Sequence, residues 1–102
     1  MGFMEFNADD VTIVHNDKDR LYSAEYQGAS IAFCAYAEDA QARIRDFNHT
    51  VTQPEYGGHG LAGKVVRHAL DDSISNGFSI QAGCSYVEHF IEKNPGYKEH
   101  LA

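Results

Sequence analysis

The fold of this chain is decided by one stretch, Gly57-Gly58-His59-Gly60-Leu61-Ala62-Gly63, a glycine-rich turn that leads directly into a helical pattern. The residues before the turn alternate like a strand, and those after it have helical spacing. The first backbone N–H groups of such a helix have no partner within it and point toward one place. Glycine lacks a Cβ, so a ligand can approach this backbone closely. The turn therefore predicts a phosphate or pyrophosphate site, and the alternative is a tight turn that binds no ligand.

Four segments before the turn predict β-strands, because their residues alternate or are continuously apolar and short polar or glycine-containing turns separate them. The links are short enough for hairpins, which indicates an antiparallel meander. Strict alternation along the fourth segment should place Asp46 and Thr50 on one face and Phe47, His49 and Val51 on the other. The predicted strands are residues 11–14, 20–27, 29–37 and 43–52.

The pattern changes after the turn. Apolar residues recur at helical spacing from Leu61 to Ile74, and a helix typically ends at a pair such as Asn76-Gly77. Residues 78–82 alternate again and predict a fifth strand. Ser85 and the glutamate three residues later fit a capping box, with Ser85 as the N-cap of a short helix over 86–93. A strand–helix–strand link favours a fifth strand parallel to the fourth, so the fold class is α/β with a mixed sheet.

Composition predicts one globular domain over residues 1–102 and excludes several classes of protein. The 15 acidic and 8 basic residues give a net charge of −7, which argues against a nucleic-acid-binding protein. No apolar run is long enough for a membrane span, and no signal peptide follows Met1. Cys34 and Cys84 are therefore expected to be free thiols in a reducing cytoplasm. The six histidines lack ligand spacing, so no metal site is expected.

Two side chains are candidates for chemistry. Cys84 stands beside a predicted helix start, where the helix dipole would lower the pKa of its thiol; the alternative is a buried, inert cysteine. Cys34 lies in the most apolar strand, which favours the inert alternative there. His49 precedes the turn and could accept a proton near neutral pH, or serve only as a structural histidine. The acidic pairs Glu38-Asp39 and Asp71-Asp72 fit solvated charge.

A family resemblance connects these features. The segment Pro54-Glu55-Tyr56-Gly57-Gly58-His59-Gly60-Leu61-Ala62 resembles the acetyl-CoA loop of GCN5-related N-acetyltransferases, whose pattern is Q/R-x-x-G-x-G/A after a strand and a proline. Two further segments are similar to the smallest members of that family. They are His49-Thr50-x-Thr52 and Cys84-Ser85-Tyr86-Val87 followed by Phe90-Ile91-Glu92-Lys93-Asn94-Pro95-Gly96-Tyr97. The resemblance extends from Val11 to Leu101.

The resemblance implies that acetyl-CoA, or coenzyme A, binds in an opening between the fourth and fifth strands. The acetyl thioester would then reach toward Cys84. Backbone groups of Thr50, Val51 and Thr52 would pair with the pantetheine arm. The pyrophosphate would be held by the amides of Gly58, His59, Gly60, Leu61, Ala62 and Gly63. Two positions depart from the family pattern: Gly57 replaces Gln or Arg, and Ile91 stands where larger relatives have a tyrosine that protonates the leaving thiolate.

The activity that the resemblance implies is transfer of acetyl to a primary amine. Cys84 would assist or transiently carry the acetyl group, and His49 would act as a base or positioning group. The acceptor is either a small molecule or a lysine-bearing protein, and the acidic charge favours a cationic one. The alternatives are a non-catalytic CoA-binding or interaction module and a redox-sensing thiol at Cys84. The sequence leaves open whether the protein is a monomer or a weak homodimer.

Overall fold

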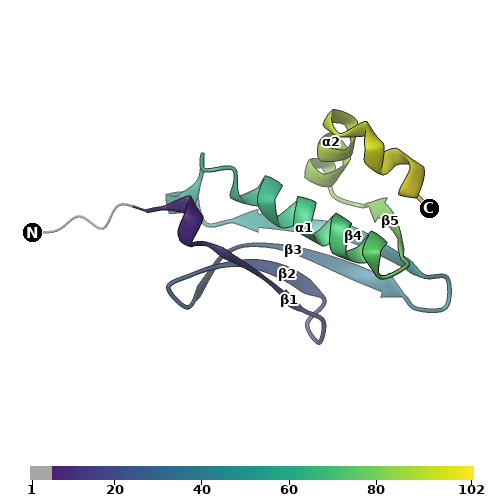
Figure 1. Ribbon diagram of the computed structural model, residues 1–102, viewed down its shortest axis with the longest axis horizontal. Helices are drawn as coiled ribbons and strands as arrows, with labels where there is room; N and C mark the ends of the chain where they lie inside the picture. Colours follow the sequence, from purple (N-terminus) through teal and green to yellow (C-terminus); the bar gives the residue numbers. More distant parts are fainter. Residues whose placement is uncertain (1–5) are drawn as a thin grey trace, which may run out of the picture.

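The computed structural model describes residues 6–102 and contains a five-stranded sheet whose strands lie side by side in sequence order (Figure 1). The first four strands pair antiparallel, and the fifth runs parallel to the fourth. This confirms the predicted mixed α/β sheet, and each predicted strand end lies within two residues of the observed one. The strands are β1 (Thr12–Asn16), β2 (Leu21–Tyr26), β3 (Ala29–Asp39), β4 (Ile44–Thr52) and β5 (Ser79–Ala82).

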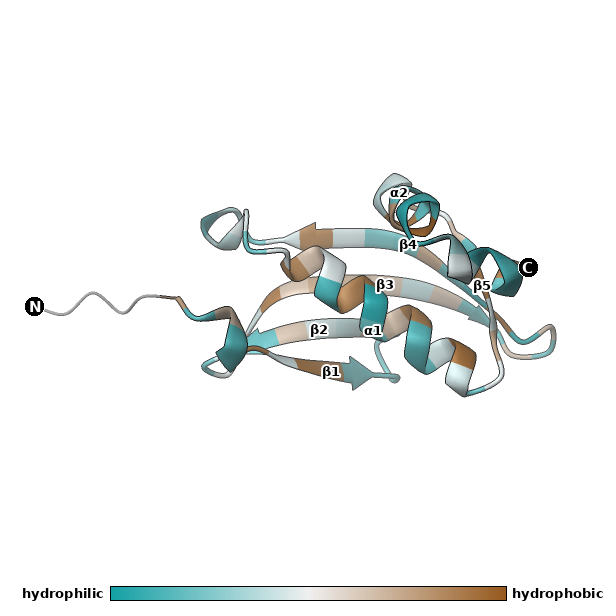
Figure 2. Cartoon of the chain, turned by 45° about the horizontal axis from the view of Figure 1, so that its top comes forward, coloured by the Kyte–Doolittle hydropathy of each residue, from teal (hydrophilic) through white to brown (hydrophobic). Residues whose placement is uncertain are grey.

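Helix α1 (Leu61–Ser75) lies across one face of the sheet and begins and ends where the sequence predicts (Figure 1). Hydrophobic and hydrophilic residues alternate around it (Figure 2), so that one side packs on the strands and the other faces solvent. In residues 6–102, no helix is both long and apolar enough to cross a membrane. The buried apolar residues of α1 are Leu61, Val65, Val66, Ala69 and Leu70. They pack against Tyr22, Cys34, Tyr36, Phe47 and Ile80 from the sheet.

Strand β4 departs from the predicted alternation because it contains a bulge. Asn48 has no partner in β3, although the residues on both sides of it do. An extra residue of this kind reverses the faces of all residues after it. Thr50 therefore lies on the same face as the buried Phe47, whereas His49 and Val51 are exposed on the face away from α1. The predicted grouping of Phe47, His49 and Val51 on one face is wrong for this reason.

Helix α2 (Ser85–Lys93) begins one residue earlier than predicted, and its N-cap is Cys84, not Ser85. The Cys84 N–H still continues the β5 ladder, donating to the Phe47 carbonyl at 3.0 Å. The Cys84 carbonyl already accepts the first helical hydrogen bond, from Glu88 N–H at 3.0 Å. The capping box is therefore absent, and the chain turns from strand to helix at the cysteine itself. A 3-10 helix, η3 (Pro95–His100), follows α2 and packs beside it.

A buried cation joins the sheet to α1. Arg45 on β4 is only 7% exposed; its Nε donates to Glu38 at 3.0 Å, and its Nη1 donates to the Tyr22 hydroxyl at 2.9 Å and Ser73 Oγ at 3.1 Å. The Tyr22 hydroxyl in turn donates to Asp72 at 2.6 Å. Glu38 and Asp72 are thus structural partners, which corrects the prediction of solvated charge at both. A buried guanidinium needs such partners because removing its charge from water is costly.

Candidate functional site

An opening lies between β4 and the start of α2, because β5 stops pairing before β4 ends. The two strands pair over Ile44–Phe47 and Ser79–Ala82, and the Cys84 N–H adds one further bond to β4. Beyond that bond, none of the described residues 6–102 pairs with β4 on this side as far as Thr52. The parallel pair is therefore splayed, and unpaired backbone is available beside Cys84.

The register of β3 and β4 shows which backbone groups face the opening. The Gln53 N–H donates to β3 at 2.9 Å. Hydrogen-bonded pairs alternate in an antiparallel ladder, so the amide and carbonyl of Val51 also face β3, whereas those of Thr50 and Thr52 face the opening. The Thr50 amide is indeed directed at the Cys84 sulfur. Of the three predicted backbone contacts, two are therefore oriented to receive an extended ligand, and Val51 is not.

The thiol of Cys84 is partly exposed at the head of this opening. Burial opposes its ionisation, but contacts from the Thr50 hydroxyl and from the amides of Tyr86 and Val87 outweigh that effect and lower the pKa of the thiol. The Thr50 Oγ1 lies 3.6 Å from the sulfur. The two helix amides form no capping bond of good geometry, so their influence on the sulfur is electrostatic. The direction of this shift is the one that the sequence predicts.

A second cysteine meets the same threonine. The Thr50 hydroxyl donates to Cys34 at 3.9 Å, and burial raises the pKa of the Cys34 thiol to about 11. Cys34 is fully buried, in agreement with the inert role predicted for it. A threonine hydroxyl has a single proton, so Thr50 can donate it to only one sulfur at a time. The sulfur of Cys84 is the one that ionises more readily and would attract it.

The position of Cys84 depends on the residue before it. The Gly83 N–H donates to Asp46 Oδ1 at 2.9 Å, which ties the end of β5 to the side chain of a β4 residue. A Cβ at Gly83 would lie 2.6 Å from the same oxygen and 3.2 Å from the Cβ of Asn48. The close approach therefore requires glycine here. Nothing in the sequence pointed to this contact between Gly83 and Asp46.

The glycine turn has the backbone geometry that an anion site needs. Gly58 and Gly60 have φ values of 83° and 71°, which favour glycine, and Gly60 is the N-cap of α1. The first helical bond runs from the Lys64 N–H to the Gly60 carbonyl at 3.1 Å. The N–H groups of residues 61–63 therefore have no acceptor within the helix, and its first turn holds no acidic side chain. These amides lie among those predicted to bind the pyrophosphate.

The turn is packed against aromatic side chains. The ring of His59 lies 4.7 Å from that of Phe6, and Phe6 also contacts Tyr26 and Tyr56 at 4.8 and 5.1 Å between ring centres. His59 was predicted to contribute an amide, and its exposed side chain helps to hold the turn against the first described residues. Nothing in the sequence indicated this contact for Phe6, because an isolated phenylalanine belongs to no recognisable pattern.

Like Phe6, Tyr86 was assigned no role from the sequence, although it belongs to the segment Cys84-Ser85-Tyr86-Val87 that resembles the family. It lies in the first turn of α2 and is 41% exposed. A Cβ at Gly63 would lie 3.5 Å from its hydroxyl, so the tyrosine reaches from α2 to the first turn of α1. The side chain thus borders the route from the unpaired amides of α1 to Cys84.

The structure does not bring His49 to Cys84. The His49 ring lies 5.8 Å from that of Phe33, on the face of β4 away from α1, whereas the Cys84 thiol contacts Thr50 on the other face. A part for His49 in proton transfer stays a prediction. Ile91 is 3% exposed and packs in the core. In residues 6–102, no three His, Cys, Asp or Glu side chains are grouped to share a metal ion.

Comparison with known proteins agrees with this arrangement. A model of the GCN5-related N-acetyltransferase family matches residues 21–100. The chain belongs to this family. Protein NATD1 from Gallus gallus is 27% identical to this chain over 93 residues. The alignment covers 89% of this chain and 84% of NATD1. Human NATD1 is 24% identical over 85 residues, covering 83% of this chain and 75% of NATD1.

Solved structures show the same family fold. A GCN5-like protein from Staphylococcus aureus aligns with a TM-score of 0.68 and 20% identity over 91% of this chain and 89% of its own. The N-acetyltransferase YhbS from Escherichia coli, solved in complex with CoA, aligns with a TM-score of 0.55 and 22% identity. That alignment covers 61% of this chain and 38% of YhbS. At these identities the likeness establishes the fold alone. The match to the family model confirms the resemblance to GCN5-related N-acetyltransferases that the sequence indicated.

Proposed function

We propose that this protein binds acetyl-CoA and transfers the acetyl group to a primary amine, with Cys84 at the reaction centre. The observation that carries the proposal is the continuity of the site. Unpaired amides at the start of α1, the open backbone of Thr50 and Thr52, and a thiol of lowered pKa follow one another along β4. Membership of the family and the CoA complex of YhbS support the same assignment.

The residues present fit acetyl-CoA at both ends of the site. The amides of residues 61–63, at the positive end of α1, would hold the pyrophosphate. The backbone groups of Thr50 and Thr52 would pair with the amides of the pantetheine arm. The chain carries a net charge of −7, so a polyphosphate gains no general attraction and depends on these local donors.

Acetyl-CoA would supply an activated acetyl group as a thioester; in the transfer a C–N bond replaces the C–S bond, and the proton that the amine loses ends on the CoA sulfur. Cys84 can hold or release a proton at its Sγ. Its lowered pKa also favours the thiolate, the form that could carry the acetyl group itself. The Thr50 hydroxyl stabilises that thiolate by donating to it. Both roles place the same sulfur at the centre.

A second candidate function is CoA binding without transfer. Gly57 brings no polar side chain to the turn, and the buried Ile91 brings no acid to the opening. His49 lies on the other face of β4. These features favour a site that has kept the cofactor pocket and lost the chemistry.

The test separates binding from turnover. Native mass spectrometry would detect bound CoA, and chromatography would follow release of free CoA from acetyl-CoA with a panel of primary amines, including spermidine and a lysine peptide. Cys84→Ala should bind CoA normally but lower kcat by about a hundredfold or more, as expected for loss of a proton-transferring or nucleophilic group. Cys34→Ala is the matched control, because it removes the buried thiol and should leave turnover intact.

Each outcome decides one part of the proposal. Turnover that survives in Cys84→Ala would remove Cys84 from the reaction centre. CoA binding without amine-dependent release in the wild type would favour the binding module. A mass increase of one acetyl group, present in the wild type and absent in Cys84→Ala, would identify Cys84 as the carrier and not merely an assisting thiol.

A further inference from the structure

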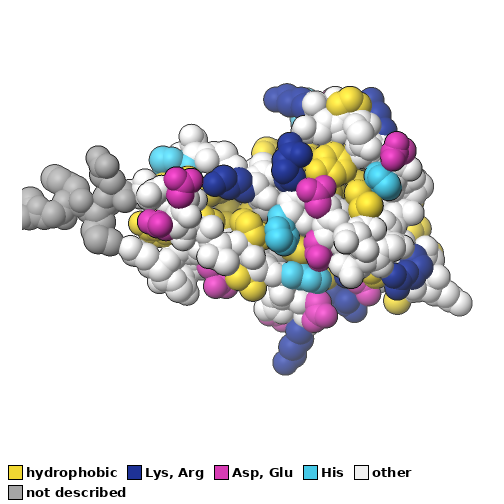
Figure 3. Space-filling model, in the orientation of Figure 1, with side chains coloured by type: hydrophobic (Ala, Val, Ile, Leu, Met, Phe, Trp, Pro, Cys, Tyr) yellow, Lys and Arg dark blue, Asp and Glu magenta, His cyan; other side chains and the backbone are white. Residues whose placement is uncertain are grey.

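A groove lies between the C-terminal half of α1 and the segment formed by the end of α2 and η3. Its volume is about 590 Å³, which is within the usual range of small-molecule sites. Asp71, which lines it, is roughly 16 Å along α1 from the N-cap Gly60, at the helical rise of about 1.5 Å per residue. None of the residues that line the groove belongs to the glycine turn or to the opening beside Cys84, so the groove is separate from both. Hydrophobic side chains are exposed in this region, flanked by charged ones (Figure 3).

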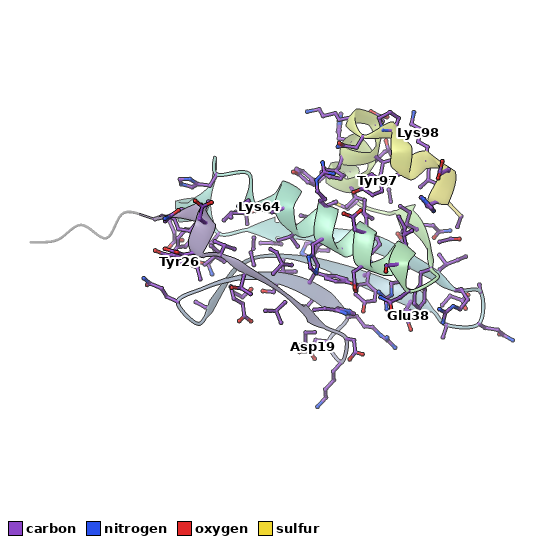
Figure 4. The ribbon with its side chains drawn as sticks, viewed as in Figure 1. Asp19, Tyr26, Glu38, Lys64, Tyr97 and Lys98 are labelled. Atoms are coloured by element: carbon purple, nitrogen blue, oxygen red, sulfur yellow. The ribbon has the colours of Figure 1, made fainter. Side chains whose placement is uncertain are left out.

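The walls of the groove are held in place by contacts between its own residues. Tyr97 extends from η3 toward α1 (Figure 4), and its hydroxyl donates to Asp71 at 2.7 Å. The Arg67 guanidinium donates to Asn94 Oδ1 at 3.2 Å and to the Tyr97 hydroxyl at 3.4 Å. It also lies 5.2 Å from the centre of the Phe90 ring. The groove is thus preformed, with its cation fixed by three neighbours.

The charge of the groove is opposite to that of the protein. Arg67, Lys93 and His100 line it with a single carboxylate, Asp71, in a chain that has 15 acidic and 8 basic residues. Within the part of the chain that the structure describes, no carboxylate lies within 4.0 Å of the Arg67 or Lys93 nitrogens. Among these described residues, Arg67 and Lys93 therefore make no direct ion pair, and the one carboxylate of the groove, Asp71, meets Arg67 only through the shared Tyr97 hydroxyl. Two cations against one carboxylate disfavour a cationic amine in this groove.

We propose that this groove is a second ligand site, which takes a small organic anion with a flat apolar body, of the class of aromatic carboxylates. Arg67 uses two of its five N–H donors on its neighbours, and the remainder can engage a carboxylate in the paired geometry that guanidinium favours. Lys93 adds a second positive charge. Ile74, Pro95 and the Tyr97 ring supply the apolar surface for the body of the ligand.

The experiment compares three ligands that share a ring and differ in charge. Isotope-labelled protein would be titrated at low ionic strength with benzoate, neutral benzamide and cationic benzylamine, and amide resonances would be followed by NMR. Benzoate should bind in the millimolar range typical of fragments and shift resonances of residues 67–75 and 93–100. Benzamide should bind about tenfold more weakly, since it lacks the charge-assisted hydrogen bonds, and benzylamine should not bind.

Two variants test the contribution of the cations. Arg67→Gln and Lys93→Gln should each weaken benzoate binding severalfold. The matched control is Lys18→Gln, which removes the same charge from the exposed turn between β1 and β2 and should leave binding unchanged. The proposal fails if benzoate does not bind, if benzamide binds equally well, or if the shifts fall on residues 57–63 instead. An equal loss in Lys18→Gln would reduce the effect to general charge and would also overturn it.

Discussion

Replacing Gly83 by alanine should destabilise the protein and displace Cys84. The added Cβ would lie 2.6 Å from Asp46 Oδ1, 3.1 Å from Oδ2 and 3.2 Å from the Cβ of Asn48, all closer than ordinary van der Waals contact. The carboxylate can rotate away only by giving up its 2.9 Å hydrogen bond from the Gly83 N–H. If it stays, the chain must move, and the adjacent Cys84 moves with it.

The magnitude follows from the less costly of these two responses. A hydrogen bond to a charged acceptor contributes about 1.5–3 kcal/mol, and the lower end applies to Asp46 because it is partly exposed to water. We therefore expect Gly83→Ala to lower the free energy of unfolding by about 1.5 kcal/mol. For a domain of this size, that corresponds to a fall in Tm of about 6–12 °C.

Thermal unfolding and thiol alkylation measure the two consequences. Gly96→Ala is the matched control, because a Cβ there meets no atom within 4 Å, and its Tm should stay equal or rise slightly. In an Asp46→Ser background the cost of Gly83→Ala should shrink, since the clashing carboxylate is gone. The packing argument is refuted if Gly83→Ala matches Gly96→Ala in Tm and alkylates at Cys84 at the wild-type rate.

Three further outcomes are expected. Gly57→Gln should tighten CoA binding severalfold, as measured by calorimetry, because the new side-chain amide restores a polar group at the turn. The φ value of −62° at Gly57 is one that any residue adopts, and an unchanged CoA affinity would contradict the prediction. Iodoacetamide should alkylate Cys84 with a pH midpoint below that of free cysteine in the same assay, because the thiolate is the reactive form and the pKa of this thiol is lowered. A midpoint above that of free cysteine would be inconsistent with the site. Thr50→Val should move that profile to higher pH, since it removes the hydroxyl that stabilises the thiolate, while the buried Cys34 stays unreacted.

The sequence predicted the architecture well because each element has a strong local signal. The period of apolar residues changes from two to helical spacing at the glycine turn, and Asn76-Gly77 ends the helix where expected. The unpaired amides of residues 61–63 followed from their place at a helix start. These features depend on neighbours in the sequence, which is why they could be inferred without the structure.

The features that the sequence missed all depend on contacts between distant residues. The bulge at Asn48 is fixed by pairing with β3, and no local pattern marks it, so Thr50 and His49 were assigned to the wrong faces. The link from Thr50 to Cys84 follows from that bulge. The contact of Asp46 with Gly83 joins residues 37 positions apart. The N-cap at Cys84 was missed because Ser85 is the better capping residue in isolation.

The buried network around Arg45 also bears on how the chain avoids misfolding. A one-residue slip of β4 against its neighbours would turn Arg45 to the opposite face of the sheet, away from Tyr22 and Ser73. Glu38 and the polar groups on α1 would then be left in the interior without their cation, at a cost far above that of a shifted apolar contact. Apolar packing tolerates small shifts, but this network accepts a single strand register. The network therefore fixes the register of β4, the strand that borders the opening beside Cys84.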